Sequence, residues 1–262
     1  MTDSTALETV PLALKALRLP TMARCWQDLA SEAAREGWSH ERFLGSLCDQ
    51  ELAERTSRRL AARLQASHLP PGKRLDSFNF QRAPSVSRAV VESLTGGDWL
   101  RPGGNVLVFG GTGSGKTHCA AGIGYGLIES GYNVLFVRTA ELVQRMQLAR
   151  KELSLPQMLT KLDRMDVIIL DDIGYARKDP AESSVLFELI AERYERRSLI
   201  ITSDRSFKDW DSIFPDKTMT VAAIDRLVHH STILEFGAES YRLKEAAKRN
   251  STSVSRHLLA IS

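Results

Sequence analysis

Eight consecutive residues have the types and spacing of a loop that binds phosphate groups. They match the pattern G-x-x-x-x-G-K-[ST], and they are Gly110, Gly111, Thr112, Gly113, Ser114, Gly115, Lys116 and Thr117. Glycines let successive backbone N–H groups turn inward around a phosphate, because they have no Cβ atom. The pattern predicts that Lys116 reaches the β- and γ-phosphates of a bound nucleotide and that the Thr117 hydroxyl binds Mg²⁺.

The residues on either side of this loop predict that it joins a strand to a helix. Residues 105–109 read as a buried strand, and an alanine-rich helix is expected over 116–130. A helix N-terminus adds N–H donors and a favourable dipole for an anion. This strand–loop–helix order is what phosphate binding requires, and it makes a chance glycine-rich turn the weaker interpretation.

A second candidate element is the apolar run 167–170, which ends in Asp171 and Asp172. After a phosphate-binding loop, such a strand is expected to supply a carboxylate to Mg²⁺. We therefore expect Asp171 to bind the metal at the carboxyl end of the strand and Asp172 to polarise an attacking water. A buried strand that merely stops at solvent has the same pattern, and the loop is what favours the catalytic interpretation.

Two further elements carry polar residues whose roles stay open at this level. The apolar run 198–201 is followed by Thr202, Ser203 and Asp204, which could contact a γ-phosphate or simply enter a turn. Arg226 lies on a helix expected to be capped by Thr220. An arginine can stabilise transition-state charge when a neighbouring subunit supplies it, although the residues alone favour a surface pair with Asp225.

Composition limits the classes of protein that the chain can belong to. Of its 262 residues, 43% are hydrophobic and 26% are charged, as in soluble globular proteins. No apolar run approaches the roughly 20 residues of a membrane span, and the N-terminus does not resemble a secretory signal. The cysteines are scattered, which favours a reducing cytoplasm over a disulfide framework. The net charge of +3 is compatible with nucleic acid without requiring it.

The pattern of secondary structure that the sequence predicts changes at Pro70-Pro71-Gly72. Residues 12–68 show helical periodicity and no strands, which fits either a small bundle with a solvated face or a module that docks a partner protein. From residue 105 onward, strands and helices alternate. The strands are continuous apolar runs, which predicts an α/β fold with a parallel sheet covered on both faces. The expected strands are 105–109, 133–137, 167–171, 198–203 and 232–236, and the expected helices between them are 116–130, 139–152, 181–197 and 220–230.

The order of these motifs closely resembles the IstB-like family. The phosphate-binding loop is followed by Ile-Leu-Asp-Asp-Ile-Gly-Tyr, Ile-Ile-Thr-Ser-Asp-Arg-Ser-Phe-x-x-Trp, Ala-Ile-Asp-Arg-Leu-x-His-His and Glu-Ser-Tyr-Arg-Leu-Lys. The resemblance spans roughly residues 12–250. Such proteins are ATP-binding helpers of insertion-sequence transposition, within the AAA+ class and related to DnaC-type helicase loaders.

The resemblance implies a role for each candidate residue. Lys116 would bind ATP, Asp171 and Thr117 would hold Mg²⁺, Asp172 would be the catalytic carboxylate, and Arg226 would be an arginine finger. The family's third motif usually ends in Thr-Ser-Asn, whereas this chain has Asp204. A carboxylate there would repel a γ-phosphate, so Ser203 or Thr202 is expected to share the role.

The resemblance also implies an organisation. We expect a P-loop NTPase fold of the AAA+ class with a five-stranded parallel sheet. The expected domains are a helical, partner-docking domain over 1–70, an ATPase domain over 71–250 and a tail over 251–262. The stretch after Phe236 is expected to be too short for a full C-terminal lid. Arg242 is a candidate to replace the arginine that such a lid would supply.

Candidate DNA contacts are scattered cations, each of which could equally belong to a solvated face. Aromatic residues are sparse among them, so backbone contact without sequence readout is the expected mode. The candidates are Arg145, Arg150, Lys151, Arg177, Lys178 and the stretch 242–256, which carries five basic residues and one acid.

The expected function is therefore that of an Mg²⁺-dependent ATPase that helps transposition. It would form a homo-oligomer with ATP between subunits, assemble on duplex DNA and recruit or activate a transposase in the cytoplasm, without membrane contact. Two alternatives remain at this level. One is a helicase loader that acts on single-stranded DNA, and the other is an ATP-gated DNA-binding scaffold with negligible hydrolysis.

Overall fold

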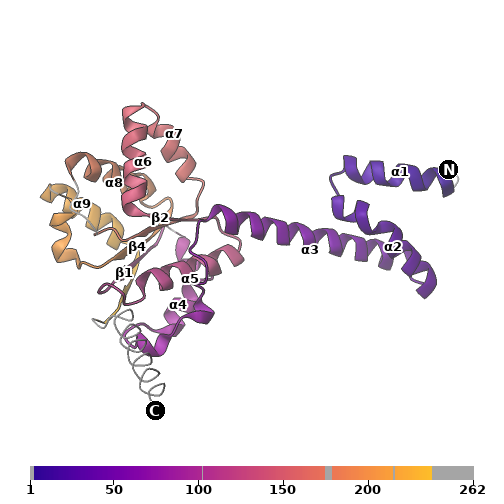
Figure 1. Ribbon diagram of the computed structural model, residues 1–262, viewed down its shortest axis with the longest axis horizontal. Helices are drawn as coiled ribbons and strands as arrows, with labels where there is room; N and C mark the ends of the chain where they lie inside the picture. Colours follow the sequence, from indigo (N-terminus) through magenta and orange to yellow (C-terminus); the bar gives the residue numbers. More distant parts are fainter. Residues whose placement is uncertain (1–2, 102, 175–178, 215, 238–262) are drawn as a thin grey trace, which may run out of the picture. The chain divides into compact units, whose positions relative to one another are not determined.

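The computed structural model describes residues 3–101, 103–174, 179–214 and 216–237 (Figure 1). The chain divides into two compact units, Met1–Ala62 and Arg63–Ser262. The division lies inside one long helix, whereas the sequence places the boundary at Pro70-Pro71-Gly72.

The N-terminal unit is helical, as its periodicity predicts. It contains α1 (Asp3–Ala16), α2 (Pro20–Glu36) and most of α3 (His40–Ala66). Its apolar residues face one another and form a small core around Met22, Leu29 and Leu47. Trp26 and Trp38 pack against this core and are partly buried.

One buried carboxylate joins α3 to the start of α2. The Glu51 side chain accepts hydrogen bonds from the backbone N–H groups of Thr21 (2.8 Å) and Met22 (3.1 Å) and from Arg55 (2.9 Å). Burial alone would raise the pKa of Glu51, but these three sets of hydrogen bonds outweigh it, so that the pKa lies below its ordinary value. Glu51 therefore acts as an N-terminal cap supplied from another helix.

The second unit alternates strands and helices. Its strands are β1 (Asn105–Phe109), β2 (Val134–Arg138), β3 (Val167–Asp171), β4 (Ser198–Ser203) and β5 (Ser231–Glu235). Its α-helices beyond α3 are α4 (Arg88–Leu94), α5 (Lys116–Glu129), α6 (Thr139–Lys151), α7 (Leu155–Leu162), α8 (Pro180–Arg193) and α9 (Lys217–Val228). Short 3₁₀ turns cover Leu75–Ser77, Phe80–Arg82, Asp98–Leu100 and Phe207–Ser212.

The five strands form one parallel sheet in the order β2-β3-β4-β1-β5, which confirms the predicted fold class. Strand β1 lies in the interior and is paired on both sides, with β4 and with β5. In a parallel sheet all carboxyl ends meet at one edge. The ends of β1, β3 and β4, where the sequence places its chemistry, are therefore brought together.

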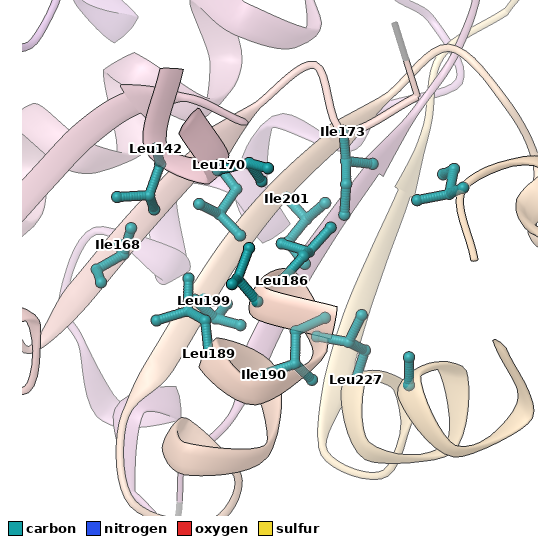
Figure 2. Packing of buried hydrophobic residues seen from close by; sticks show 14 of the residues in the cluster. Leu142, Ile168, Leu170, Ile173, Leu186, Leu189, Ile190, Leu199, Ile201 and Leu227 are labelled. Carbon is teal, nitrogen blue, oxygen red and sulfur yellow. The ribbon is translucent and has the colours of Figure 1, made fainter. Parts of the chain in front are cut away.

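Helices cover both faces of the sheet. Helix α5 lies on one face, and α6, α8 and α9 lie on the other (Figure 1). Figure 2 shows the core under the second group, where leucines of α6, α8 and α9 pack on apolar residues of β3 and β4. The labelled members are Leu142, Ile168, Leu170, Ile173, Leu186, Leu189, Ile190, Leu199, Ile201 and Leu227.

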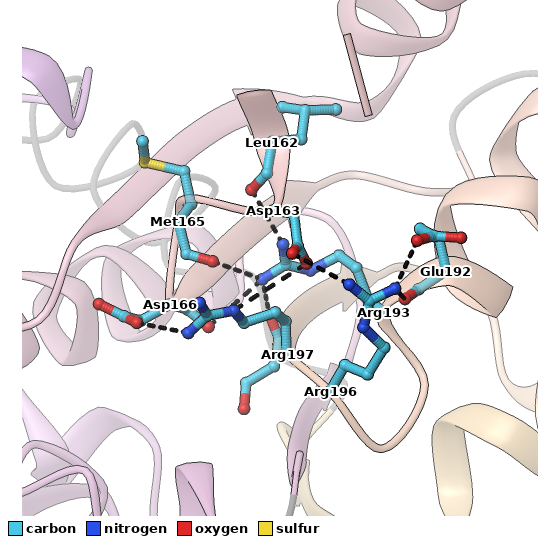
Figure 3. A network of polar contacts seen from close by, with 9 residues as sticks. Leu162, Asp163, Met165, Asp166, Glu192, Arg193, Arg196 and Arg197 are labelled. Carbon is cyan, nitrogen blue, oxygen red and sulfur yellow. Dashed lines mark hydrogen bonds and ion pairs between the residues drawn. The ribbon is translucent and has the colours of Figure 1, made fainter. Parts of the chain in front are cut away.

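A buried arginine secures the opposite, amino-terminal ends of β3 and β4 (Figure 3). The Arg193 side chain at the end of α8 is 2% exposed, and its guanidinium donates to the backbone oxygens of Leu162, Met165, Asp166 and Ser198. Burial lowers the pKa of Arg193 to about 10, so it stays charged near neutral pH. Because one planar group satisfies four carbonyls, it fixes α8 to the strands before they enter the sheet.

Some element boundaries differ from the prediction. Strands β2 and β5 are shifted by one residue, and α7 was not expected. Helix α9 is capped by Asp216, whose carboxylate accepts from the N–H groups of Thr218 (2.7 Å) and Met219 (3.3 Å). The predicted cap, Thr220, lies one turn inside the helix and donates its hydroxyl to the Phe214 oxygen instead. The expectation about a lid concerns residues 238–262, which lie outside the described residues, as does Arg242.

Within the described part of the chain, every helix is too short or too polar to cross a membrane.

Candidate functional site

The phosphate-binding loop runs from the end of β1 to the start of α5, as predicted. Gly110 has a φ of +152° and Gly115 a φ of +109°, values that side chains rarely adopt. A Cβ on Gly110 would lie 2.6 Å from the Cβ of Phe236, and one on Gly115 would lie 3.3 Å from the Phe78 ring. Both glycines are therefore required by backbone conformation and by the close approach of an aromatic residue.

Lys116 lies across the loop. Its ammonium donates to the backbone oxygens of Gly110 (2.7 Å) and Gly111 (2.9 Å), and its side chain is buried. It is also the first residue of α5, so its charge lies where the N–H groups of the loop and of the helix start are close together. This arrangement suits a polyphosphate, whose negative charge the ammonium would offset.

Three motifs that are distant in sequence meet at one carboxylate oxygen. The hydroxyl of Thr117 donates to Oδ1 of Asp171 at 2.9 Å, and the hydroxyl of Thr202 donates to the same atom at 2.8 Å. Asp171 is 8% exposed. A hydroxyl and a carboxylate are hard oxygen donors, which Mg²⁺ prefers. The residues therefore fit the predicted metal.

Asp172 begins the turn that follows β3. Its φ is +62°, an uncommon value for a residue with a side chain. Its N–H donates to the Thr202 hydroxyl at 2.8 Å. The backbone oxygen of Asp171 accepts from the Thr139 hydroxyl at 3.0 Å. The backbone around the two aspartates is thus held from β4 on one side and from α6 on the other.

The three candidates at the end of β4 lie in different environments. Thr202 contacts the Asp171 group, as described. The hydroxyl of Ser203 is used within its own turn, because it donates to the Arg205 oxygen (2.8 Å) and accepts from the Arg205 N–H (3.1 Å). Asp204 is exposed, and its carboxylate lies near Gly174, where an added Cβ would be 2.9 Å from it. Thr202 is therefore the one that the structure joins to the predicted metal ligand.

Arg226 is partly buried on α9 and contacts α8. Its guanidinium donates to the Ala222 oxygen (2.9 Å) and lies over the rings of Phe187 (5.3 Å) and Tyr194 (5.9 Å). Within the described chain, its contacts are with α8 and α9 rather than with the Asp171 group. The position of Arg226 therefore does not indicate a role at the phosphate-binding loop of its own chain.

A cavity of about 320 Å³ opens beside the loop. One wall is formed by the loop and by the start of α5, and the other by residues 73–83, which precede β1. The Phe78 ring contacts His118 edge-on, with 5.2 Å between ring centroids, and His118 Nε2 lies 2.9 Å from the Arg74 oxygen and 3.2 Å from the Ser77 hydroxyl. Aromatic and polar groups beside a phosphate-binding loop suit a nucleoside. The lining residues on this wall are Lys73, Ser77, Phe78, Asn79, Arg82 and Ala83.

Nothing in the sequence pattern indicates this wall. Residues 73–83 have neither strand nor helix periodicity, and only the fold brings them to the loop. The closest signal was the aromatic spacing of Phe78 and Phe80, which indicates local packing and no particular ligand.

The candidate DNA contacts on α6 are partly used within the chain. Arg145 lies 3.6 Å from Glu141, and Arg150 pairs with Glu188 and donates to the Ser184 hydroxyl at 3.1 Å. Lys151 is exposed. Arg177, Lys178 and the stretch 242–256 lie outside the described residues.

Known proteins resemble this chain over most of its length. A protein from Sinorhizobium fredii, named as an insertion sequence ATP-binding protein, is 53% identical over 91% of this chain and 81% of its own. The ATP-binding protein named for insertion sequence IS21 of Pseudomonas aeruginosa is 35% identical over 95% of this chain and 96% of its own.

Solved structures share the fold. Domain III of the replication initiation protein DnaA from Thermotoga maritima superposes with a TM-score of 0.54 at 17% identity and covers 72% of this chain and 77% of that chain. At such low identity the likeness concerns the fold alone, which is that of AAA+ P-loop NTPases, as predicted. Residues 12–249 match the family described as IstB-like ATP binding protein. The chain thus has the family's motifs in order, on the expected sheet and over nearly its whole length, and it belongs to the IstB-like ATP-binding family.

Proposed function

We propose that this chain binds ATP with Mg²⁺ at the loop 110–117 and hydrolyses it. The observation that carries the proposal is the meeting of Thr117 and Thr202 at one oxygen of the buried Asp171. Thr117 and Asp171 would hold Mg²⁺, which when bound neutralises charge on the phosphate oxygens. Lys116 would exchange the carbonyls of Gly110 and Gly111 for phosphate oxygens.

For hydrolysis, Asp172 would accept a hydrogen bond from the attacking water and so orient it. Its position is set by Thr202, which holds both the Asp172 N–H and the Asp171 carboxylate. Ser203 and Asp204 are proposed to act at the edge of the site, near the γ-phosphate. The exposed carboxylate of Asp204 would disfavour a γ-phosphate nearby, which favours slow turnover.

The cavity beside the loop is proposed to take the nucleoside. Its position next to Gly115 and Thr117 would place the ribose and the base against residues 73–83. The Phe78 ring offers an apolar face, while Asn79 and Arg82 offer donors. Phe78→Ala should therefore weaken the binding of ATP and ADP alike, because the base is common to both.

We further propose that ATP is bound between subunits of a homo-oligomer that assembles on duplex DNA and recruits or activates a transposase. Membership of the IstB-like family and the insertion-sequence names of the relatives support this proposal. Arg226 would be supplied in trans, and the helical residues 1–70 would dock the partner, leaving 71–250 as the ATPase domain and 251–262 as a tail.

Calorimetry with Mg²⁺–ATP tests the central claim. Lys116→Ala should abolish detectable binding, whereas Lys161→Ala, which removes an exposed lysine of α7, should bind like wild type. Unchanged affinity in Lys116→Ala would remove the proposed site.

Titration with labelled duplex and single-stranded DNA, with and without ATP, then separates the candidate functions. An ATP-dependent preference for duplex supports the transposition helper, and a preference for single strands supports a helicase loader. DNA binding gated by ATP but without phosphate release supports a scaffold.

A further inference from the structure

A second cluster of ligand-type side chains lies away from the nucleotide site. It consists of Glu195, which follows α8, and of His229 and His230, which join α9 to β5. The backbone oxygen of His230 accepts from the N–H of Asn105, the first residue of β1, at 2.8 Å. The cluster therefore lies at the amino-terminal edge of the sheet, whereas Asp171 lies at the carboxyl edge.

We propose that Glu195, His229 and His230 form a binding site for a divalent transition-metal ion such as Zn²⁺. Each side chain offers one ligand atom, and the three atoms lie within 4.8 Å of one another. The nearest nitrogens of His229 and His230 are both 3.8 Å from the same Glu195 oxygen. Donors around a tetrahedral zinc ion, at about 2.0–2.1 Å from it, are about 3.3 Å apart. Small side-chain rotations would therefore bring all three into coordination.

The donor set selects the class of metal. Two imidazoles with one carboxylate suit zinc and other first-row divalent ions. Mg²⁺ and Ca²⁺ prefer oxygen ligands only. The Mg²⁺ that accompanies ATP would therefore not compete for this cluster.

Neighbouring groups hold the cluster in shape. The hydroxyl of Tyr194 is 2.8 Å from Nδ1 of His229, and the rings of His229 and His230 lie with their centroids 4.0 Å apart. The Glu195 backbone is in close contact with Gly103, where a Cβ would lie 2.9 Å from it. On metal binding, the Tyr194 O–H would turn away from Nδ1 and leave the nitrogen lone pair to the ion.

Metal binding would link the ends of α8 and α9. Arg226 lies one turn before His229 on α9, over the Tyr194 ring. The ion would thus restrain the helix that carries the proposed arginine finger. Only this consequence depends on the proposed ATPase function, because the metal site itself is independent of nucleotide.

Calorimetry of the nucleotide-free, full-length chain with Zn²⁺ tests the proposal. We expect one Zn²⁺ per chain, with affinity lowered more than about tenfold by His229→Ala, by His230→Ala and by Glu195→Gln. His40→Ala, which removes an exposed histidine of α3, should leave the affinity unchanged. Absence of binding to the wild type, or equal affinity in the His229→Ala/His230→Ala double variant, would overturn the site.

A measurement on the wild-type chain tests the site even if the variants fold poorly. X-ray absorption of the Zn²⁺-loaded wild type should show nitrogen and oxygen ligands with two imidazoles. Sulfur in the coordination sphere would place the ion on a cysteine and contradict the proposal. Mg²⁺–ATP binding by each variant reports its fold and tests the proposed function separately.

Discussion

The hydroxyl of Thr202 on β4 donates to the carboxylate of Asp171 on β3, 2.8 Å away. Because the same hydroxyl accepts from the N–H of Asp172, one side chain fixes both aspartates that the proposed reaction needs. The two strands are hydrogen-bonded neighbours, so this relationship is built into the strand order.

Replacing Thr202 by valine should lower ATP turnover by about ten- to a hundredfold, since a hydrogen bond to a charged group contributes about 1.5–3 kcal/mol. Binding of Mg²⁺–ATP should change less, because Lys116 and Thr117 remain. Steady-state phosphate release and calorimetry measure the two effects. Thr202→Ser keeps the hydroxyl and should recover most of the activity, and equal turnover in both variants would argue against this role.

Asp172→Asn should bind ATP but hydrolyse it slowly. The amide keeps the shape and removes the negative charge that would orient the water. If ATP holds subunits together on DNA, this variant should dissociate from duplex DNA more slowly than wild type after ATP is diluted. Fluorescence anisotropy follows the dissociation. Wild-type turnover in Asp172→Asn would move the catalytic role elsewhere, with Asp204 as the next candidate.

Arg226 should act on the nucleotide of a neighbouring subunit. Arg226→Ala and Lys116→Ala chains should each be inactive alone. Their mixture should recover part of the activity, because a Lys116→Ala chain can supply its Arg226 to an intact loop next door. A trans-acting arginine can contribute roughly 10³–10⁵ in rate. Arg164→Ala, which removes an exposed arginine just after α7, is the matched control. Mixed oligomers without recovery would leave Arg226 with a structural role against Phe187 and Tyr194.

A chain that begins at residue 60 should be more stable than one that begins at Gly72. The second lacks the Ser67 oxygen, which accepts from the Phe136 N–H on β2 (2.7 Å), and the Pro70 oxygen, which accepts from Tyr125 (3.2 Å). Each hydrogen bond contributes about 1 kcal/mol. Thermal unfolding followed by circular dichroism compares the two chains. Equal melting temperatures would support Pro70-Pro71-Gly72 as the boundary between the two domains.

Acid should loosen the start of α2 through Glu51. The folded state lowers the pKa of this carboxyl, so its contribution is complete above the ordinary glutamate value, about 4.3. The contribution is lost as the pH falls through the lowered value. Amide exchange at Thr21 and Met22, corrected for intrinsic rates, should therefore speed up as the pH falls below the ordinary glutamate value. Glu51→Gln should lack this pH dependence, and an identical profile in this variant would assign the effect to another group.

The sequence predicted the parts of the fold that depend on local pattern. The strands 105–109, 167–171 and 198–203 were predicted to the residue, because each is a buried run bounded by polar or glycine residues. The predicted cap of α9, Thr220, was wrong. Aspartate and threonine both favour the cap position, and only the tertiary position of Phe214 decides between Asp216 and Thr220.

The site shows the same division between local and tertiary information. Residue types identified Lys116, Asp171 and Asp172, but they could not distinguish Thr202 from Ser203, since neighbouring strand residues point to opposite faces and the pattern does not show which one meets Asp171. The wall made by residues 73–83 was missed, because it forms only when that segment packs against the start of α5.

The glycine that opens the phosphate-binding loop is in close contact with Phe236, which follows the neighbouring edge strand β5. The N–H of Phe236, just after β5, donates to the Phe109 oxygen at 2.8 Å, and the next residue, Gly110, has no room for even a Cβ beside Phe236. The Phe236 ring in turn faces Phe78, 6.3 Å away between centroids. If a bound phosphate took Lys116 from the Gly110 carbonyl, as proposed above, a shift of that peptide toward β5 would meet the Phe236 side chain.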